Sequence, residues 1–282
     1  MSRHPETDEG KAMSAVKLND ITISYDDIGH GEDVLVLLHG HPFDRSMWRP
    51  QCDALGGKRW RLIVPDLRGY GESTVTPSTT TLDMLAHDVA ALLDHLGIDA
   101  AVIGGLSMGG QIVMAFCHLY PQRVRGVVLA ATFPQAETDD GKQVRNTMAD
   151  RLLRDGMEGY AAEVLPRMVA PRTLAARPDI AAHVLGMMRG AHPIGAAAAL
   201  RGRAERPCYD AVLSALPVPA LIVVGDEDAF TTRADAERMH TLITGSTLVW
   251  MPGVGHMPNL EHADAFNAAL ESFLLTFGSA PT

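Results

Sequence analysis

Residues 101–110 of the chain read Ala-Val-Ile-Gly-Gly-Leu-Ser-Met-Gly-Gly and join an apolar run to a helical pattern. Ala101–Gly104 has the composition of a buried strand, and the motif G-x-S-x-G follows directly at Gly105–Gly109. In this strand-to-helix context the motif predicts a sharp turn that lifts the Ser107 hydroxyl above the edge of a sheet. The glycines allow so tight a turn because they have no side chain to clash. Ser107 is therefore the candidate nucleophile, and a Gly/Ser turn that matches the motif by chance is the alternative.

Apolar runs of the same kind recur on both sides of this motif and alternate with helical patterns. Continuous apolar runs bounded by turn residues are typical of strands that are covered on both faces in a parallel sheet. The predicted strands are Ala15–Leu18, Ile21–Asp26, Val34–Leu38, Arg61–Pro65, Ala101–Gly104, Val124–Ala130, Ala220–Val224 and Thr247–Met251. The predicted helices include Asp83–Leu96, Gly109–Tyr120 and Pro258–Phe277. We expect Thr80 to cap the first of them and Gly97 to end it. This alternation predicts an α/β fold with a mostly parallel, eight-stranded sheet flanked by helices.

One long segment, residues 135–216, breaks the alternation. It contains no convincing strand, and its Ala-, Met-, Leu- and Arg-rich helical patterns are interrupted by prolines. The segment is too long for a loop. We therefore expect a helical cap over 135–216, inserted into an α/β core formed by 16–134 and 217–282. Residues 1–15 show no periodicity, and we expect them to be a disordered extension.

The composition limits the classes of function. Hydrophobic residues make up 46% of the 282 residues and charged residues 21%, which is typical of a globular protein. The formal net charge of −10, without a compensating Lys/Arg cluster, argues against a nucleic-acid partner. No apolar run reaches the roughly 18–20 residues that span a bilayer, and the polar first residues do not resemble a signal peptide. The three widely spaced cysteines (Cys52, Cys117 and Cys208) form no C-x-x-C pair, so we expect reduced thiols and a cytoplasmic location.

A serine hydroxyl needs a neighbouring base to act as a nucleophile at neutral pH. Of the 12 histidines, His256 stands apart because it lies between the last predicted strand and the last predicted helix. That loop opens at the same edge of the sheet as Ser107. His256 is therefore the candidate general base, and a structural loop histidine is the alternative.

The acid that orients the base should follow a strand between the serine and the histidine in the chain. The strand Ala220–Val224 ends in Gly225-Asp226-Glu227-Asp228, which offers three carboxylates. One of them is needed to hold the imidazole tautomer and to stabilise the imidazolium. The residues alone leave the choice among the three open.

A tetrahedral intermediate also needs backbone N–H donors for its oxyanion. The amide of Met108, the residue after the candidate nucleophile, is one such donor. We expect the second to be the amide of His41, in the loop His39–Pro42 that follows the strand Val34–Leu38. The His41 side chain is expected to line the pocket, with a role as a second base as the alternative.

Five segments, in this order, resemble the α/β-hydrolase superfamily over about Leu18–Phe277. They are His39–Pro42, Pro65–Ser73, Gly105–Gly109, Gly225–Asp228 and Gly255–His256. The family pattern G-x-x-D after the seventh strand implies Asp228 as the acid. The resemblance also implies that the segment Asp66–Ser73 has a structural role, positioning the loop after its strand.

Within the superfamily, the motif at Gly105–Gly110 and the compact helical cap look like those of 3-oxoadipate enol-lactonase-like esterases and lactonases. The stretch Ala199–Pro207 is similar to theirs, whereas His39–Pro42 departs from their polar residues and looks more like general esterases and perhydrolases. A serine at position 107 distinguishes the chain from haloalkane dehalogenases and epoxide hydrolases, which have an aspartate there.

This resemblance implies hydrolysis of a small-molecule carboxylic ester or lactone through an acyl-enzyme, with no metal and no organic cofactor. Two alternatives stay open: amide, C–C bond or peracid chemistry on the same triad, and a ligand receptor that keeps the fold. The sequence also leaves open whether the protein forms a homo-oligomer. In the predicted cap we expect Arg201 and Arg203 to lie on a solvated helix face, and contact with a substrate carboxylate is the alternative.

Overall fold

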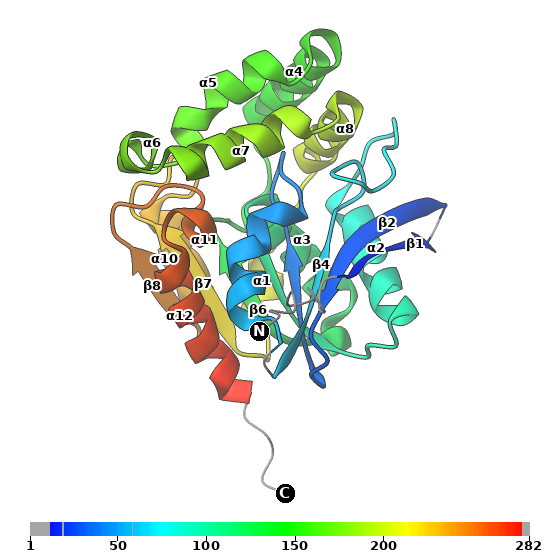
Figure 1. Ribbon diagram of the computed structural model, residues 1–282, viewed down its shortest axis with the longest axis vertical. Coiled ribbons are helices and arrows are strands. Elements are labelled where there is room, and N and C mark those ends of the chain that lie inside the picture. The colour runs from blue at the N-terminus through cyan, green and yellow to red at the C-terminus, as the bar shows by residue number, and fades with distance from the viewer. Residues whose placement is uncertain (1–11, 19, 58, 278–282) are drawn as a thin grey trace, which may run out of the picture.

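The computed structural model of the protein describes residues 12–18, 20–57 and 59–277 (Figure 1). At its centre is an eight-stranded sheet with the strand order β1-β2-β4-β3-β5-β6-β7-β8. The strands are β1 (Ala12–Leu18), β2 (Ile21–Ile28), β3 (Asp33–Leu38), β4 (Trp60–Pro65), β5 (Ala101–Leu106), β6 (Val124–Ala130), β7 (Ala220–Gly225) and β8 (Thr247–Met251). The pairs β1–β2 and β2–β4 are antiparallel, and the pairs from β4 to β8 are parallel. The predicted α/β fold is confirmed.

The amino-terminal boundary differs from the prediction. Residues 12–15, expected to belong to a disordered extension, form the first half of β1, because their backbone pairs with residues 24–27 of β2. Residues 1–11 of the expected extension lie outside the described part of the chain.

Helices cover both faces of the sheet. Figure 1 shows α1 and α12 in front of the strands and α3 behind them; α1 packs against α12, and α2 packs against α3. The helices of these layers, with their short 3-10 turns, are η1 (Arg45–Trp48), α1 (Arg49–Leu55), α2 (Leu82–His95), α3 (Met108–Leu119), η2 (Pro121–Arg123), α9 (Asp210–Ser214), α10 (Arg233–Leu242), α11 (Pro258–Glu261), α12 (Ala263–Leu274) and η3 (Leu275–Phe277).

Two helix ends differ from the sequence-based expectation. Thr81, and not Thr80, caps α2 by accepting a hydrogen bond from the amide of Met84 at 3.2 Å. The amide of Thr80 is instead bonded to the carbonyl of Ala198 at 3.1 Å, which commits Thr80 to a neighbouring helix. The predicted helix over 258–277 is broken at His262, where φ is −138° and ψ is 62°.

The segment between β6 and β7 is helical, and Figure 1 shows most of its helices gathered at one end of the molecule. These inserted helices, the name used below, are α4 (Asp139–Asp155), α5 (Glu158–Met168), α6 (Pro171–Ala176), α7 (Pro178–Gly190) and α8 (Pro193–Ala204). Proline is the first residue of three of them, where its missing N–H has no helical partner to lose. The helix α9, within the range 135–216 expected for a cap, packs against α3 and α10 of the core.

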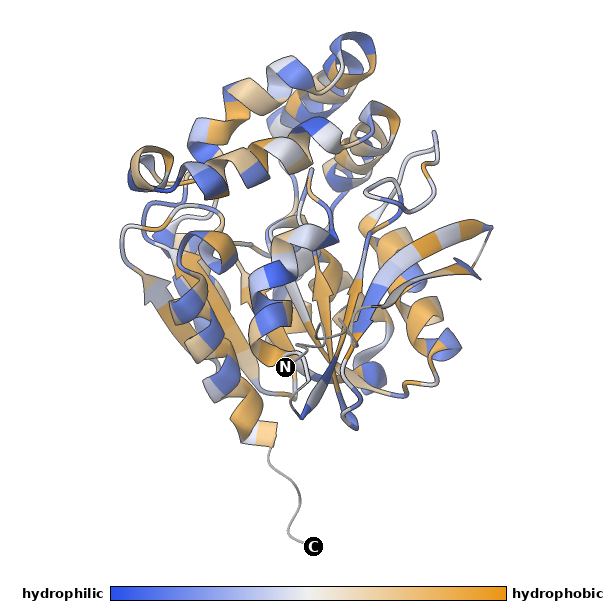
Figure 2. Ribbon diagram, in the orientation of Figure 1, coloured by the Kyte–Doolittle hydropathy of each residue, from blue (hydrophilic) through white to orange (hydrophobic). Residues whose placement is uncertain are grey.

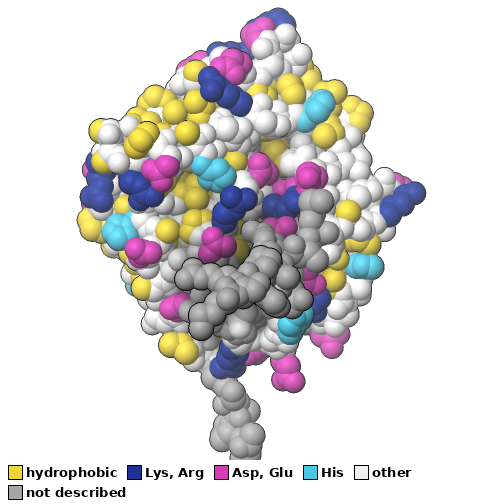
Figure 3. All heavy atoms as spheres, in the orientation of Figure 1, with side chains coloured by type: hydrophobic (Ala, Val, Ile, Leu, Met, Phe, Trp, Pro, Cys, Tyr) yellow, Lys and Arg dark blue, Asp and Glu magenta, His cyan; other side chains and the backbone are white. Residues whose placement is uncertain are grey.

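The core lies on both sides of the parallel strands. Every residue of β5 and β7 is buried, as expected for strands covered by helices on both faces. Figure 2 shows these central strands as hydrophobic, whereas the inserted helices carry mixed hydropathy. Acidic and basic side chains are interspersed over the face shown in Figure 3. In the described ranges, no helix combines the length and the apolar character needed to cross a membrane.

Candidate active site

Ser107 lies between the end of β5 and the start of α3, in a backbone conformation that is rare for a residue with a side chain. Its φ is 56° and its ψ is −113°. Such strain persists only where the surroundings hold it. Here the amide of Ser107 donates to the carbonyl of Ala130 at 2.9 Å, and its carbonyl accepts from the hydroxyl of Thr132 at 2.8 Å. The predicted sharp turn is therefore present, and Ser107 is only partly buried.

The loop after β3 passes directly beside this turn. A Cβ placed on Gly40 would lie 3.4 Å from the Cβ of Ser107 and 3.0 Å from the carbonyl oxygen of Leu106. A Cβ on Gly105 would lie 2.2 Å from the carbonyl carbon of Gly109. The absence of a side chain at Gly40 thus lets the loop after β3 approach the turn, and its absence at Gly105 lets the turn itself close tightly.

Two buried histidines organise the loop after β3. The amide of Leu67 donates to Nε2 of His39 at 2.9 Å, so the ring proton is on Nδ1, which donates to the carbonyl of Gly40 at 2.9 Å. Burial lowers the pKa of His39, in keeping with this neutral form. Nδ1 of His41 lies 2.6 Å from the hydroxyl of Tyr70, so the His41 side chain is held in place.

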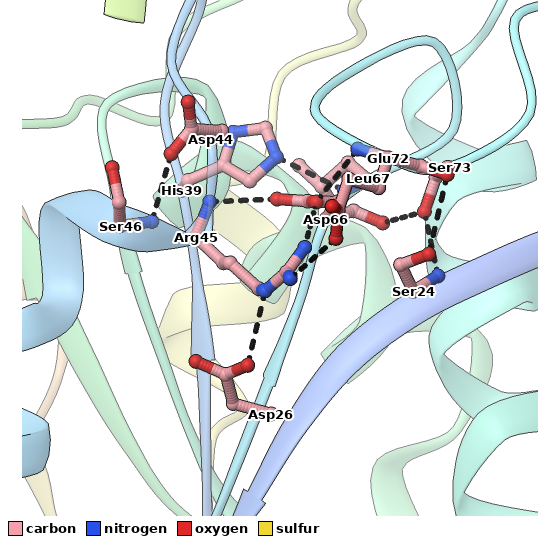
Figure 4. A network of polar contacts seen from close by, with 10 residues as sticks. All are labelled: Ser24, Asp26, His39, Asp44, Arg45, Ser46, Asp66, Leu67, Glu72 and Ser73. Atoms are coloured by element: carbon pink, nitrogen blue, oxygen red, sulfur yellow. Dashed lines mark hydrogen bonds and ion pairs between the residues drawn. The ribbon is translucent and has the colours of Figure 1, made fainter. Parts of the chain in front are cut away.

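A polar network holds the loop after β4 (Figure 4). The buried carboxylate of Asp66 accepts from the amides of Arg45 at 2.8 Å and Glu72 at 2.9 Å, and it pairs with the Arg45 guanidinium. The Ser73 hydroxyl donates to the Asp66 carbonyl at 2.7 Å and accepts from the amide of Ser24 on β2. These bonds agree with the structural role that the resemblance implies for Asp66–Ser73.

Asp228 and His256 form a buried pair. Nδ1 of His256 lies 2.9 Å from each carboxylate oxygen of Asp228, and the Asp228 side chain is fully buried. Asp226 is exposed and accepts from the amide of Gly253 at 2.6 Å, and Glu227 is also exposed. Of the three carboxylates that the sequence offers after β7, it is therefore Asp228 that reaches the imidazole.

The surroundings of Asp228 favour its charged form. Burial raises its pKa, but the facing His256 and the amides of Phe230 and Thr231 outweigh burial, so that the pKa lies below its usual value. These amides donate to one carboxylate oxygen at 2.8 and 3.1 Å. The Phe230 ring also packs on the imidazole, with 4.8 Å between the ring centroids. The carboxylate is thus oriented from two sides.

A buried carboxylate that sequence reasoning missed ties the His256 loop to the inserted helices. Glu261 accepts from the amide of Met257 at 3.1 Å, from the amide of Ala170 at 2.7 Å and from the hydroxyl of Thr173 at 2.7 Å. The amide of His256 itself donates to the carbonyl of Met168 at 3.1 Å. Glu261 gave no sequence signal, since it lies in a predicted helix far along the chain from Ala170.

The sheet topology brings the predicted site residues to one edge. The strands β3, β5, β7 and β8 are parallel, so the residues that follow them lie at the same end of the sheet. The residues concerned are His41, Ser107, Met108, Asp228 and His256. Within the described part of the chain, no hydrogen bond joins the Ser107 hydroxyl to the His256 imidazole. Met108 is buried and opens α3, whose first N–H groups lack intrahelical partners.

A family model described as the alpha/beta hydrolase family matches residues 35–269, which is most of the chain. The chain belongs to this family. This α/β hydrolase is 28% identical, over 259 residues, to 3-oxoadipate enol-lactonase 2 of Acinetobacter baylyi, a match that covers 92% of this chain and 95% of that protein. The resemblance to enol-lactonases predicted from the motifs is confirmed.

Two solved structures extend this similarity. A malate-bound thermophilic esterase from Thermogutta terrifontis superimposes with a TM-score of 0.90 at 34% identity, covering 95% of this chain and 99% of that one. The enol-lactonase from Burkholderia xenovorans LB400 superimposes with a TM-score of 0.86 at 28% identity, covering 93% and 99%.

The expectation for Arg203 of this α/β hydrolase is wrong. Only 8% of Arg203 is exposed, and its Nε donates to Oε1 of Gln111 on α3 at 3.1 Å. Helix α8 is buried along most of its length between α4 and the core, so its arginines do not share one solvated face. Arg201, two residues earlier, is one-third exposed and pairs with Asp150.

Proposed function

We propose that the protein hydrolyses a carboxylic ester or lactone through an acyl-enzyme, with Ser107 as nucleophile, His256 as general base and Asp228 as the orienting acid. The observation that carries this proposal is the buried Asp228–His256 pair. This pair lies at the same edge of the sheet as the strained turn that carries Ser107. The names of the similar esterase and enol-lactonases support the same class of reaction.

The pairing with Asp228 determines what His256 can do. Its Nδ1–H donates to the carboxylate, which leaves the Nε2 lone pair to accept a proton. Catalytic hydrogen bonds are often long before substrate binds and tighten in the complex. We therefore place the Ser107–His256 hydrogen bond in the complex with substrate.

Acylation forms one bond, breaks one bond and moves one proton from Ser107 through His256 to the leaving alcohol. Oγ of Ser107 attacks the carbonyl carbon while its proton passes to Nε2 of His256. The C–O bond to the alcohol then breaks, and His256 returns the proton to the leaving alkoxide. In deacylation, water gives one proton to Nε2 of His256 and attacks the acyl carbon. The bond from the acyl carbon to Oγ of Ser107 then breaks, His256 returns the proton to Oγ, and the carboxylic acid is released.

The amides of Met108 and His41 are proposed to hold the oxyanion. The close approach of Gly40 to Ser107 supports this assignment, since it brings the loop after β3 beside the first turn of α3. Loss of one such donor costs about 3–4 kcal/mol of transition-state stabilisation in comparable sites.

We propose that residues 135–216 act as a cap that shapes the substrate site. The contacts of Met168 and Ala170 with the His256 loop support this role, because they tie the inserted helices to the proposed base. The odd number of widely spaced cysteines favours a cytoplasmic location as part of the same proposal.

Labelling with a fluorophosphonate probe tests the nucleophile. The wild type should be labelled at Ser107, Ser107→Ala should lose both labelling and esterase activity, and Ser214→Ala, at an exposed position on α9, should keep both. Labelling that persists in Ser107→Ala would contradict the assignment.

A panel of 4-nitrophenyl esters, lactones and anilides tests the reaction. Turnover of esters or lactones is expected. Turnover of anilides alone would move the function to amide chemistry, and tight ligand binding without product would indicate a receptor.

A further inference from the structure

Arg203 is a buried cation without a buried anion. More than nine-tenths of the residue is buried, and its hydrogen bond to Oε1 of Gln111 at 3.1 Å goes to a neutral group. Among the described residues, no carboxylate forms an ion pair with it. A guanidinium stays protonated in proteins and has five N–H donors, so most of its hydrogen-bonding capacity is unused here.

The surrounding charges do not neutralise it. Arg145 and Arg206 both pair with Glu137, which leaves a net positive charge in this region. Burial, together with the charges of Arg145 and Arg206, lowers the pKa of Arg203 well below its usual value. The guanidinium nevertheless keeps its proton. The lowered pKa of Arg203 therefore means that its charge has lost hydration and has gained no counter-ion among the described residues in return.

Arg203 is connected to the turn of the proposed nucleophile through one side chain, that of Gln111. Its partner Gln111 is one helical turn after Ser107, and the amide of Gln111 donates to the Ser107 carbonyl at 3.1 Å. Burial and then the charge of Arg203 hold the pKa of His41 well below its usual value. Gln111 thus links the cation to the turn that carries Ser107.

Two further polar groups lack a hydrogen-bond partner within the described part of the chain, and one of them is a buried atom. Nε2 of His41 makes no hydrogen bond, although Nδ1 of the same ring is bonded to Tyr70. The hydroxyl of Tyr160, a residue that is 8% exposed, makes none either. The Tyr160 ring packs on His41, with 6.2 Å between the ring centroids. Among the residues that the structure describes, Arg203 therefore lacks a counter-ion, and Nε2 of His41 lacks a hydrogen-bond partner.

We propose that Arg203 binds a carboxylate carried by the substrate, so that the preferred ester or lactone is an anion. The planar guanidinium fork matches the two oxygens of a carboxylate, and the Tyr160 hydroxyl offers a further donor. Nε2 of His41 offers another in the tautomer in which Nδ1 accepts from the Tyr70 hydroxyl. This inference rests on the proposed function and adds the substrate class to it. A bound carboxylate would supply the missing counter-charge and hold the reacting carbonyl beside Ser107.

The test compares matched anionic and neutral substrates. The anionic set consists of mono-4-nitrophenyl esters of succinic, glutaric and adipic acid, together with 4-carboxyphenyl butyrate; the neutral set consists of their methyl esters. In the wild type, kcat/KM for at least one anionic ester should exceed that for its methyl ester by roughly 10- to 100-fold, the range for hydrogen bonds to charged groups.

Two arginine variants separate a binding role from a structural one. Arg203→Met should lose the preference for the anion and keep the turnover of neutral esters. Arg201→Met, on the same helix but paired with Asp150, should keep both. Equal losses for anionic and neutral esters in Arg203→Met, or no anionic preference in the wild type, would overturn the inference while leaving ester hydrolysis intact.

Direct binding makes the inference independent of turnover. Calorimetric titration with butyrate, glutarate and inorganic phosphate should show carboxylate binding to Ser107→Ala that weakens at least tenfold when Arg203→Met is added. Equal carboxylate binding with and without Arg203, or binding of phosphate alone, would overturn it. If Arg203→Met does not fold, Arg203→Lys replaces it in both assays. Arg203→Lys should weaken the preference for the anion several-fold, because a point charge replaces the guanidinium fork. An unchanged preference counts against the inference.

Discussion

Gly109 lies against the carbonyl group of Leu38: a Cβ on Gly109 would stand 2.2 Å from that oxygen. Leu38 ends β3, and Gly109 is the second residue of α3. The start of α3, just after Ser107, therefore packs directly against the end of β3, just before His41. No rotamer change can relieve such a clash, because the obstructing atom belongs to the backbone.

We expect Gly109→Ala to destabilise the fold by about 1–3 kcal/mol and to reduce kcat at least 100-fold, since the helix start and the loop after β3 must move apart. Chemical denaturation and ester turnover measure the two effects. Gly186→Ala is the matched control: Gly186 lies in α7, where an added Cβ would meet open space, so alanine should stabilise by about 0.5–1 kcal/mol. Wild-type turnover in Gly109→Ala would contradict the proposed arrangement.

The assignment of Asp228 predicts unequal effects of two conservative changes. Asp228→Asn should lower kcat by about 10⁴-fold, because the amide no longer holds the Nδ1–H tautomer of His256. Asp226→Asn should lower it only a few-fold, since Asp226 contacts the amide of Gly253. Steady-state kinetics on one ester, with circular dichroism to verify folding, distinguish them. Similar losses in both variants would remove Asp228 from its assigned role.

The hydrogen bonds of Glu261 predict a link between the inserted helices and the proposed base. Glu261→Ala leaves two backbone amides and the Thr173 hydroxyl without their partner, and should destabilise the protein by about 2–5 kcal/mol. Limited proteolysis should then cut first between α5 and α6. Glu237→Ala, at an exposed position on α10, should change stability by less than about 0.5 kcal/mol. A stability loss without increased cleavage near Ala170 would argue against this link.

The ion pairs of Glu137 predict a pH-dependent contribution to stability. Burial raises its pKa, but the bond and charge of Arg145 and the charge of Arg206 outweigh burial and lower the pKa below its usual value. The ionised carboxylate therefore stabilises the fold above the unfolded pKa of about 4.3. This contribution falls away as the pH drops through the lower, folded pKa.

Denaturation of the wild type and Glu137→Gln at several pH values measures this effect. The difference in the free energy of unfolding should be roughly 1 kcal/mol near pH 7 and should shrink below about pH 4. Glu163→Gln, which disrupts an exposed pair with Arg151, should show almost no difference at any pH. A difference that grows on acidification would have the wrong sign.

The turn that carries Ser107 could be predicted from the sequence because neighbouring residues determine it. A buried strand, a run of glycines and a helical pattern occupy adjacent positions, and each constrains its neighbours directly. The bounds of β6 and β8 were predicted to the residue for the same reason, since an apolar run ends where the turn residues begin. The α/β class then followed from the alternation of such runs with helical patterns.

The partners of the charged side chains depended on the folded chain. The residues alone left three carboxylates open after β7, and Asp228 was implied only by the family pattern; the contact of Asp228 with a histidine 28 residues away appears only in the folded chain. Arg203 meets Gln111 across 92 positions, and Glu261 meets Ala170 across 91. Hydrophobic periodicity reports which face of an element is buried, but the sheet order and the packing of the inserted helices determine which polar groups meet there. A charge such as that of Arg203 is therefore buried or solvated according to neighbours that come from distant parts of the chain.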